Sequence, residues 1–130
     1  MPLAVTALYT GLLGLLFLGL SALVVANRYR SGVALGEGGD KVLERAIRVH
    51  ANFAEYVPLT LILIAALEMN GAPAWTVHAL GLALLAGRLL HAWGLYRSSG
   101  TSFGRGAGVF LTWTVLLLAA LGAIWQAAAV

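Results

Sequence analysis

Four long apolar stretches follow one another along the chain, and short polar or glycine-containing segments separate them. One helical span of a bilayer needs about 20 mostly apolar residues, and each stretch reaches that length. The pattern therefore predicts membrane-spanning helices over residues 3–26, 41–69, 74–96 and 105–128. Because these helices and their short connections use up the chain, we expect one domain over residues 1–130. The predicted fold class is an all-α, integral membrane four-helix bundle.

Composition agrees with a lipid environment. Of the 130 residues, 61% are hydrophobic and only 10% are charged, whereas a soluble domain has roughly 45–50% apolar and about 25% charged residues. The chain contains no cysteine, which excludes a disulfide framework, thiolate-bound metal and a protein thiol nucleophile. Any thiol chemistry therefore needs a thiol that a ligand supplies.

The basic residues predict the orientation in the membrane. The formal net charge is +3, and the eight lysines and arginines lie in or beside the first and third connections: Arg28, Arg30, Lys41, Arg45, Arg48, Arg88, Arg97 and Arg105. The positive-inside rule places both connections in the cytoplasm and both termini on the opposite side. Since this topology accounts for the basic residues, we expect no nucleic-acid partner and predict a bacterial inner-membrane location.

The first half of the predicted second helix carries a polar face. At about 100° per residue, five polar side chains fall within an arc of roughly 100°: Glu44, Arg45, Arg48, Asn52 and Glu55. Glu44 stands four residues before Arg48, the favourable acid-first order for an ion pair. A charge at membrane depth costs about 2.5–3.5 kcal/mol on insertion scales. The face must therefore meet protein, water or a charged ligand.

Two interpretations of this face remain open. It either forms an ion-pair network that holds the bundle, with Arg88 as a partner for a carboxylate of the second helix, or it lines a binding site. The depth of Glu55 favours a functional role for that residue, because depth raises the cost of its charge. Arg88 and His91 stand three residues apart and share a face of the third helix.

The three histidines do not suggest a metal centre. His50, His78 and His91 are spread over two helices and two depths, with no His-x-x-x-His or Glu-x-x-His spacing. We therefore expect no metal. His50 lies on the side of its helix away from the charged arc, which favours packing, and His78 is expected at a membrane interface.

Several arginines, one amide and buried carboxylates suit a small zwitterion rich in carboxylate groups. Arginine binds carboxylates in a bidentate manner, and a glutamate suits an ammonium group. Glutathione has two carboxylates, one ammonium, two peptide bonds and the thiol that this chain lacks. Many other anionic metabolites would satisfy the same groups.

The motifs resemble those of the MAPEG superfamily, membrane-associated proteins in eicosanoid and glutathione metabolism. The resemblance covers nearly the whole chain and includes Glu44-Arg45-x-x-Arg48-x-His50-x-Asn52-x-x-Glu55 with Tyr56 and Pro58, Gly87-Arg88-x-x-His91-x-x-Gly94, and Arg105-x-x-Gly108 leading to Thr112. Ala51 follows His50 where eicosanoid-forming members often carry arginine. With its short connections and Gly/Ala-rich helices, the chain is most similar to the small bacterial branch.

This resemblance implies a homotrimer that binds glutathione at its subunit interfaces. The expected glutathione contacts are Arg28 from a neighbouring subunit, Arg48, Asn52, Glu55 and His91, to which we add Arg88 because it shares a helix face with His91. Arg105 resembles the arginine proposed to stabilise the glutathione thiolate, and it is the predicted catalytic residue. The thiolate would attack a lipophilic electrophile or a hydroperoxide in the membrane, as a transferase or peroxidase does.

Two other functions stay under consideration. A non-catalytic trimeric scaffold or lipid-binding protein could keep the same pocket residues. A small multidrug transporter has a similar length and helix number, but it centres on a membrane-embedded glutamate in its first helix. The first acidic residue here is Glu37, beyond the first predicted span, which argues against a transporter.

Overall fold

The computed structural model describes residues 2–98, 100 and 102–129. It contains four long α-helices: α1 (Ala4–Ser31), α2 (Lys41–Met69), α3 (Ala74–Arg97) and α4 (Phe103–Ala128). Each helix is long and apolar enough to cross a membrane. The prediction of an all-α bundle with four membrane-spanning helices is therefore confirmed. The helix α2 continues through Pro58 without interruption.

The helix ends differ from the sequence prediction by more than one residue at two places. The first helix continues past Ala26 to Ser31, because Gly32 adopts a left-handed conformation (φ 69°) and its N–H closes the helix on the carbonyl of Arg28. The fourth helix begins at Phe103, where the side chain of Ser102 accepts a hydrogen bond from the N–H of Arg105. Arg28 is thus part of the last turn of α1.

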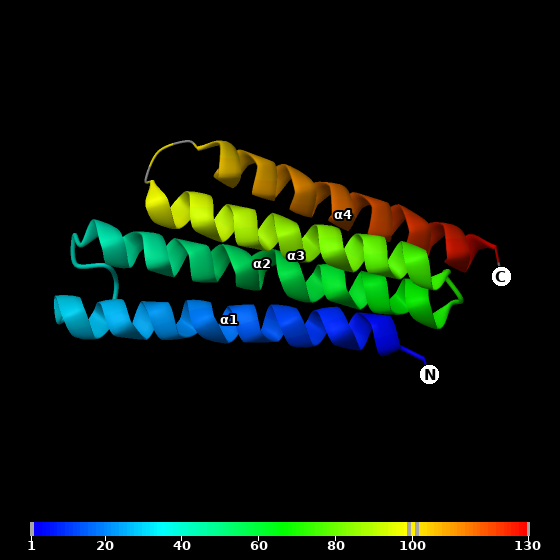
Figure 1. Ribbon diagram of the computed structural model, residues 1–130, viewed down its shortest axis with the longest axis horizontal. Coiled ribbons are helices and arrows are strands. Elements are labelled where there is room, and N and C mark those ends of the chain that lie inside the picture. The colour runs from blue at the N-terminus through cyan, green and yellow to red at the C-terminus, as the bar shows by residue number, and fades with distance from the viewer. Residues whose placement is uncertain (1, 99, 101, 130) are drawn as a thin grey trace.

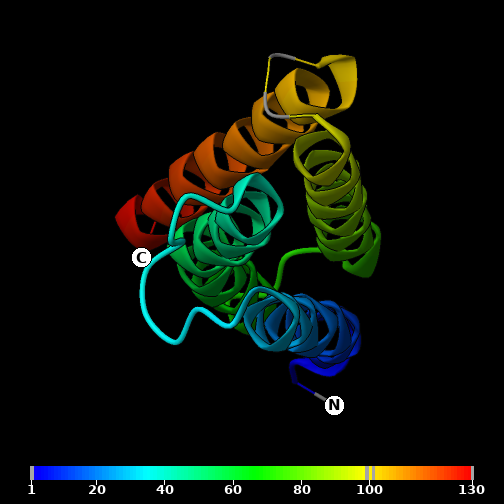
Figure 2. The same ribbon diagram turned by 90° about the vertical axis from the view of Figure 1, so that its left-hand side faces the viewer.

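The helices α2 and α3 form the centre of the bundle. Both α1 and α4 pack against this pair, and within the described part of the chain α1 and α4 do not contact each other (Figure 2). The connections α1–α2 and α3–α4 lie at one end of the bundle, whereas the α2–α3 turn and both termini lie at the other end (Figure 1). The residues that follow these two connections therefore meet at the same end.

The outer surface of the bundle is apolar, as a lipid-facing surface must be. Large hydrophobic side chains are exposed on every helix, for example Leu15, Ile62, Leu82 and Phe110. In a soluble protein an apolar surface of this extent would be an aggregation hazard. In a bilayer it is the part of the protein that meets the acyl chains.

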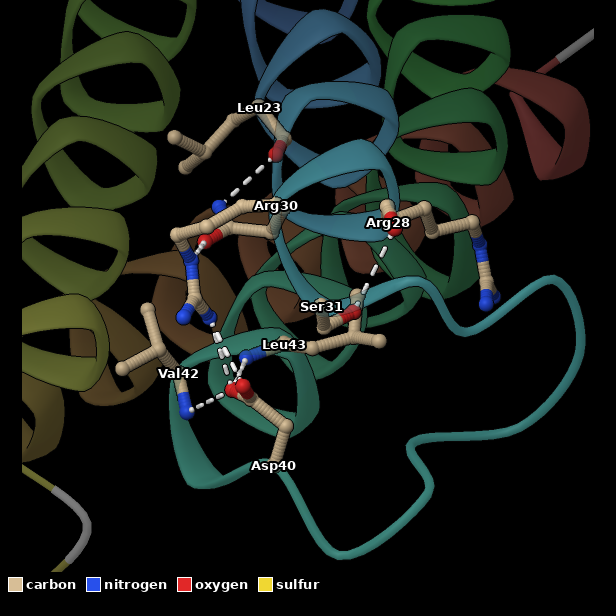
Figure 3. Close-up of polar contacts among 8 residues, drawn as sticks. Leu23, Arg28, Arg30, Ser31, Asp40, Val42 and Leu43 are labelled. Atoms are coloured by element: carbon tan, nitrogen blue, oxygen red, sulfur yellow. Dashed lines mark hydrogen bonds and ion pairs between the residues drawn. The ribbon is translucent and has the colours of Figure 1, made fainter.

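A polar contact ties the end of α1 to the start of α2 (Figure 3). The carboxylate of Asp40 caps α2 by accepting hydrogen bonds from the N–H groups of Val42 and Leu43, each at 2.9 Å. It also accepts two hydrogen bonds from Arg30, at 2.8 and 2.9 Å. The hydrogen bond from Leu43 and the contact with Arg30 lower the pKa of Asp40 below its ordinary value of 3.8.

At the opposite end, Glu68 of α2 holds the beginning of α1. No side chain caps α1 from its own N-cap position, where Leu3 stands. The Glu68 carboxylate instead accepts hydrogen bonds from the N–H groups of Val5 and Thr6, at 3.0 and 2.7 Å, and from the Thr6 hydroxyl. A carboxylate from a different helix thus satisfies the free N–H groups of α1.

Candidate functional site

A cavity of about 430 Å³ opens at the end of the bundle that carries the α1–α2 and α3–α4 connections. It has the size of a small-molecule site. Its walls come from the first part of α2, the last part of α3 and the beginning of α4: Lys41, Glu44, Arg45, Arg48, Asn52, His91, Leu95 and Arg105. The structure therefore brings four of the predicted site residues together around one cavity: Arg48, Asn52, His91 and Arg105.

The cavity carries a strong positive charge. Its lining includes three arginines and Lys41, against the single carboxylate of Glu44. That carboxylate accepts a hydrogen bond from Lys41 Nζ at 2.9 Å. The spacing of four residues had favoured an ion pair of Glu44 with Arg48. The structure instead pairs Glu44 with Lys41, the first residue of α2. Arg45 and Arg48 make no ion pair within the described residues, so they are available to an anionic ligand.

Arg88 lies behind the cavity wall and not on it. Its side chain is 1% exposed, and Nη2 donates a hydrogen bond to Asn52 Oδ1 at 2.7 Å. Nη1 makes a longer contact with Thr112 Oγ1, at 3.5 Å. The suggested pairing of Arg88 with a carboxylate of the second helix is therefore wrong, because the amide of Asn52 occupies that position.

His91 lines the cavity while remaining almost completely buried, at 2% exposure. Its Nδ1 atom lies 3.3 Å from the backbone carbonyl of Arg105. A carbonyl can only accept a hydrogen bond, so Nδ1 carries the proton in the neutral ring. His91 therefore ties α3 to the first turn of α4, where Arg105 stands.

The glycines of the sequence motifs bring α3 and α4 into close contact beside the cavity. A Cβ atom added to Gly108 would lie 2.5 Å from the backbone nitrogen of His91 and 2.6 Å from the carbonyl oxygen of Gly87. A Cβ atom on Gly94 would overlap the backbone nitrogen of Arg105. Only residues without a side chain permit this approach. The glycines are thus packing residues that position His91 and Arg105.

Besides Arg88, two further predicted site residues do not line this cavity within a single chain. Arg28 donates hydrogen bonds to the carbonyls of Val33 and Gly36, at 3.2 and 2.9 Å, and lines a separate, mainly apolar hollow. Glu55 lies on α2 just beyond the cavity, where it is exposed and makes no hydrogen bond or ion pair within the described residues. Arg28 therefore lies away from Asn52 within the chain, whereas Glu55 stands one turn beyond Asn52 on α2 without lining the cavity.

An apolar groove adjoins the cavity along the first half of α4. It has a volume of about 430 Å³ and is lined by Ser102, Arg105, Gly106, Val109, Phe110 and Trp113. Arg105 lines both hollows and thus stands between a charged cavity and an apolar groove, while its Nη1 donates a hydrogen bond to the carbonyl of Gly100 at 3.4 Å. The sequence had not indicated this groove, because Phe110 and Trp113 are apolar residues within an apolar helix.

The sequence interpretation also left Lys41, Arg45 and Leu95 out of the site. Arg45 was placed on the polar face of α2 but not among the ligand contacts. Lys41 stands one turn before Glu44 and Arg45 on the same side of α2, so the helical period could have found it. Leu95 follows His91 by one turn of α3 in the same way.

The other two histidines occupy structural positions. His50 Nε2 lies 3.1 Å from the hydroxyl of Ser21, and its ring stacks on Phe17 with 4.6 Å between ring centroids. The prediction that His50 packs away from the charged face is confirmed. His78 Nδ1 lies 3.2 Å from the hydroxyl of Tyr9, near the opposite end of the bundle from the cavity.

A bundle of four helices long and apolar enough to span a membrane, with a cationic cavity at one end, defines a helical integral membrane protein. The sequence profile of the MAPEG family matches residues 6–125, and the chain belongs to this family. Inner membrane protein YecN of Escherichia coli strain K12 is 43% identical over 121 residues, which cover 93% of this chain and 91% of the relative. The protein of the same name from Escherichia coli O6:H1 shows the same identity and coverage. The apolar helices and these relatives support an inner-membrane location.

Proposed function

We propose that the protein binds glutathione in the cationic cavity and uses its thiolate to attack lipophilic electrophiles or hydroperoxides. The observation that carries this proposal is the position of Arg105, which lines both the charged cavity and the apolar groove on α4. A water-soluble thiol on one side of Arg105 would thereby face a membrane-soluble substrate on the other. Membership of the MAPEG family, which includes glutathione transferases, supports the same function.

The cavity offers groups that match the charges of glutathione. Arg45 and Arg48 are not engaged in ion pairs within the described residues and can bind the two carboxylates. The carboxylate of Glu44 can accept a hydrogen bond from the glutathione ammonium while it keeps its contact with Lys41. The volume of about 430 Å³ lies within the range of roughly 300–1,000 Å³ for such sites.

We further propose that three copies assemble into a homotrimer. Arg28 and Glu55 are the predicted contacts that a single chain does not bring to the cavity. Glu55 carries an exposed charge within a membrane-spanning helix, a costly position unless a neighbouring subunit or ligand covers it. A second copy packed against α2 would cover Glu55 and could bring its own Arg28 to the ligand.

In this mechanism, Arg105 stabilises the thiolate of bound glutathione. A free thiol has a pKa of about 8.5, and a cation near a helix N-terminus favours the charged form. Lowering this pKa by two units needs about 2.7 kcal/mol. In conjugation, the sulfur forms a bond to the electrophilic carbon while a leaving group departs with its bonding electron pair; in an addition, the electron pair of the double bond moves to the neighbouring atom, which then takes a proton from water. With a hydroperoxide, the thiolate takes the distal oxygen as a sulfenate and releases an alcohol, after which a second glutathione yields the disulfide and water.

The test is the substitution Arg105→Ala in detergent-purified protein. We expect conjugation and peroxidase turnover to fall by about 100-fold, the rate equivalent of roughly 2.7 kcal/mol, while calorimetric binding of glutathione stays largely intact. Arg97→Ala is the control, because Arg97 stacks on Trp93 and does not line the cavity. Unchanged turnover would remove Arg105 from this role.

The same measurements separate the enzyme from a non-catalytic member of the family. Glutathione binding without turnover of any electrophile or hydroperoxide would indicate a scaffold or lipid-binding protein. Absence of binding at millimolar glutathione would contradict the whole proposal.

We propose that the cavity opens to the cytoplasm, where the positive-inside rule places the two basic connections. Arg28, Arg30, Arg97 and Arg105 gather at that end of the bundle, and both termini lie at the other end. A green fluorescent protein fused to the C-terminus should therefore stay dark, because it folds poorly after export. Bright fluorescence of the fusion would place the C-terminus in the cytoplasm and contradict the proposed orientation.

A further inference from the structure

Arg88 is a buried cation that contacts no carboxylate within the described residues. Its strongest hydrogen bond goes to Asn52 Oδ1, at 2.7 Å. The ring of Phe53 lies 5.8 Å from its guanidinium carbon. A buried cation is costly unless it is hydrogen-bonded, so the short contact with Asn52 is the principal polar interaction that fixes Arg88.

The contact with Arg88 determines which way the amide of Asn52 faces. A guanidinium group is only a donor, whereas an amide has one acceptor oxygen and one donor NH₂ group. Asn52 must therefore direct its oxygen towards Arg88. Its nitrogen, Nδ2, has no hydrogen-bond partner within the described residues, and Asn52 lines the cavity.

Thr112 holds Arg88 from the other side. The hydroxyl of Thr112 donates its hydrogen to the carbonyl of Gly108, at 2.8 Å. Its oxygen can then only accept, and it lies 3.5 Å from Arg88 Nη1. Arg88 thus spans from α4 to the amide on α2, which leaves Asn52 little freedom to turn its oxygen towards the cavity.

We propose that Arg88 is a positioning residue that turns the NH₂ group of Asn52 into the cavity and makes this part of the wall a hydrogen-bond donor. The inference rests on the proposed function and specifies it: the ligand atom beside Asn52 is a carboxylate or carbonyl oxygen. Arg88 itself does not touch the ligand. Its charge acts through the orientation of one amide.

The first experiment replaces Asn52 by Asp and by Leu in detergent-purified protein, with calorimetric titration of glutathione and thermal unfolding as readouts. Asn52→Asp keeps an acceptor for Arg88 but removes the NH₂ group. We expect its Tm to equal or exceed that of the wild type, while glutathione binds about ten- to a hundredfold more weakly. Asn52→Leu should lower Tm, because it leaves Arg88 without its partner. Retained affinity in Asn52→Asp would overturn the proposal.

A double-mutant cycle tests whether Arg88 acts through Asn52. Asn52→Ala should weaken glutathione binding strongly in the wild type but only slightly when Arg88→Met is already present, since the amide is then no longer oriented. Arg88→Lys, which keeps a donor, should restore part of the loss. Additive effects of the two substitutions on Kd would assign Arg88 a purely structural role.

The outcomes also separate this inference from the proposed function. A wild-type protein that fails to bind millimolar glutathione refutes the proposed function, and the inference with it. A wild-type protein that binds glutathione, combined with an additive cycle, refutes only the role of Arg88.

Discussion

Gly94 and Gly108 determine how closely α3 and α4 approach each other at the cavity. Because these two residues have no side chain, the backbone of Arg105 fits against Gly94 and the backbone nitrogen of His91 fits against Gly108. The two polar residues that these glycines bring together, His91 and Arg105, lie on different helices and are joined by a contact of 3.3 Å. At the scale of single residues, the shape of the cavity wall thus depends on the smallest side chains as much as on the charged ones.

Substituting Gly108 by Ala should separate α3 from α4. The added Cβ atom would meet backbone atoms of Gly87 and His91, which cannot move aside as a flexible side chain can. Overpacking of this kind costs about 1–3 kcal/mol, and we expect a value near the upper limit. Thermal unfolding in detergent, followed by tryptophan fluorescence, measures the effect.

Gly106→Ala is the matched control on the same helix. A Cβ atom at Gly106 meets nothing within 4 Å, so alanine should leave the protein unchanged or more stable by about 0.5–1 kcal/mol. Equal losses of stability for the two variants would show that helix flexibility, and not close packing, explains the role of Gly108.

The sequence predicted which residues face the cavity better than it predicted their partners. The helical period of α2 placed Arg48 and Asn52 on one face, and both line the cavity. The partner of Glu44 was wrong because a spacing of four residues permits an ion pair with Arg48 without excluding one with Lys41. The amide partner of Arg88 depends on the rotation of α3 against α2, which no periodicity within one helix reveals.

At each end of the bundle, a polar contact between two helices fixes α1 against α2. The Arg30–Asp40 pair links the last turn of α1 to the N-cap of α2, and Glu68 caps the opposite end of α1. Asp40 directly precedes the predicted helix over residues 41–69, a position at which the sequence alone indicates an N-cap. The role of Glu68 could not be predicted, because the N–H groups that it binds are more than 60 residues away in the chain.

The lowered pKa of Asp40 predicts an acid-dependent stability. A carboxyl group whose pKa is lower in the folded state stabilises the fold fully above its ordinary value of 3.8 and loses this effect as pH falls through the lowered value. We expect the Tm of Asp40→Asn to change less than that of the wild type as pH falls below about 4. The asparagine still caps α2 but does not titrate, and thermal unfolding from pH 7 to pH 3 measures the difference.

Glu37→Gln is the control for this comparison. Glu37 lies in the same connection, and its side chain makes no hydrogen bond within the described residues. Its removal should leave the acid dependence of the wild type in place. An identical acid dependence in wild type and Asp40→Asn would assign the effect to other carboxyl groups.

At the scale of the whole molecule, the two ends of the bundle differ in charge and in the elements that they carry. The two basic connections and the cavity share one end, and the Glu68 cap, the α2–α3 turn and the termini share the other (Figure 1). The lengths of the four apolar stretches were enough to predict the four helices, because the thickness of the bilayer sets the number of apolar residues that a spanning helix needs. Helical periodicity alone could not predict the separation of Arg28 from the cavity of its own chain, since it depends on how α1 packs against α2. Only the family resemblance assigned Arg28 to a neighbouring subunit.

The proposed homotrimer predicts that Arg28 acts on the cavity of a neighbouring subunit. Arg28→Ala and Arg105→Ala proteins should each have low glutathione-dependent turnover as separate homotrimers. Hybrid trimers, co-expressed with two different affinity tags and purified on both, should recover activity. Each hybrid purified on both tags contains both kinds of subunit, so about a third of its interfaces combine an intact Arg105 with an intact neighbouring Arg28.

A hybrid of Arg48→Ala and Arg105→Ala subunits is the decisive control, because both residues line the same cavity of one chain. Every cavity in that hybrid lacks one of the two arginines, so its turnover should stay as low as that of either variant alone. Recovery in the first hybrid but not in the second would assign Arg28 to the neighbouring subunit and the other two arginines to a single chain. Failure of the first hybrid to recover, with subunit exchange verified by both tags, would contradict a site shared between subunits.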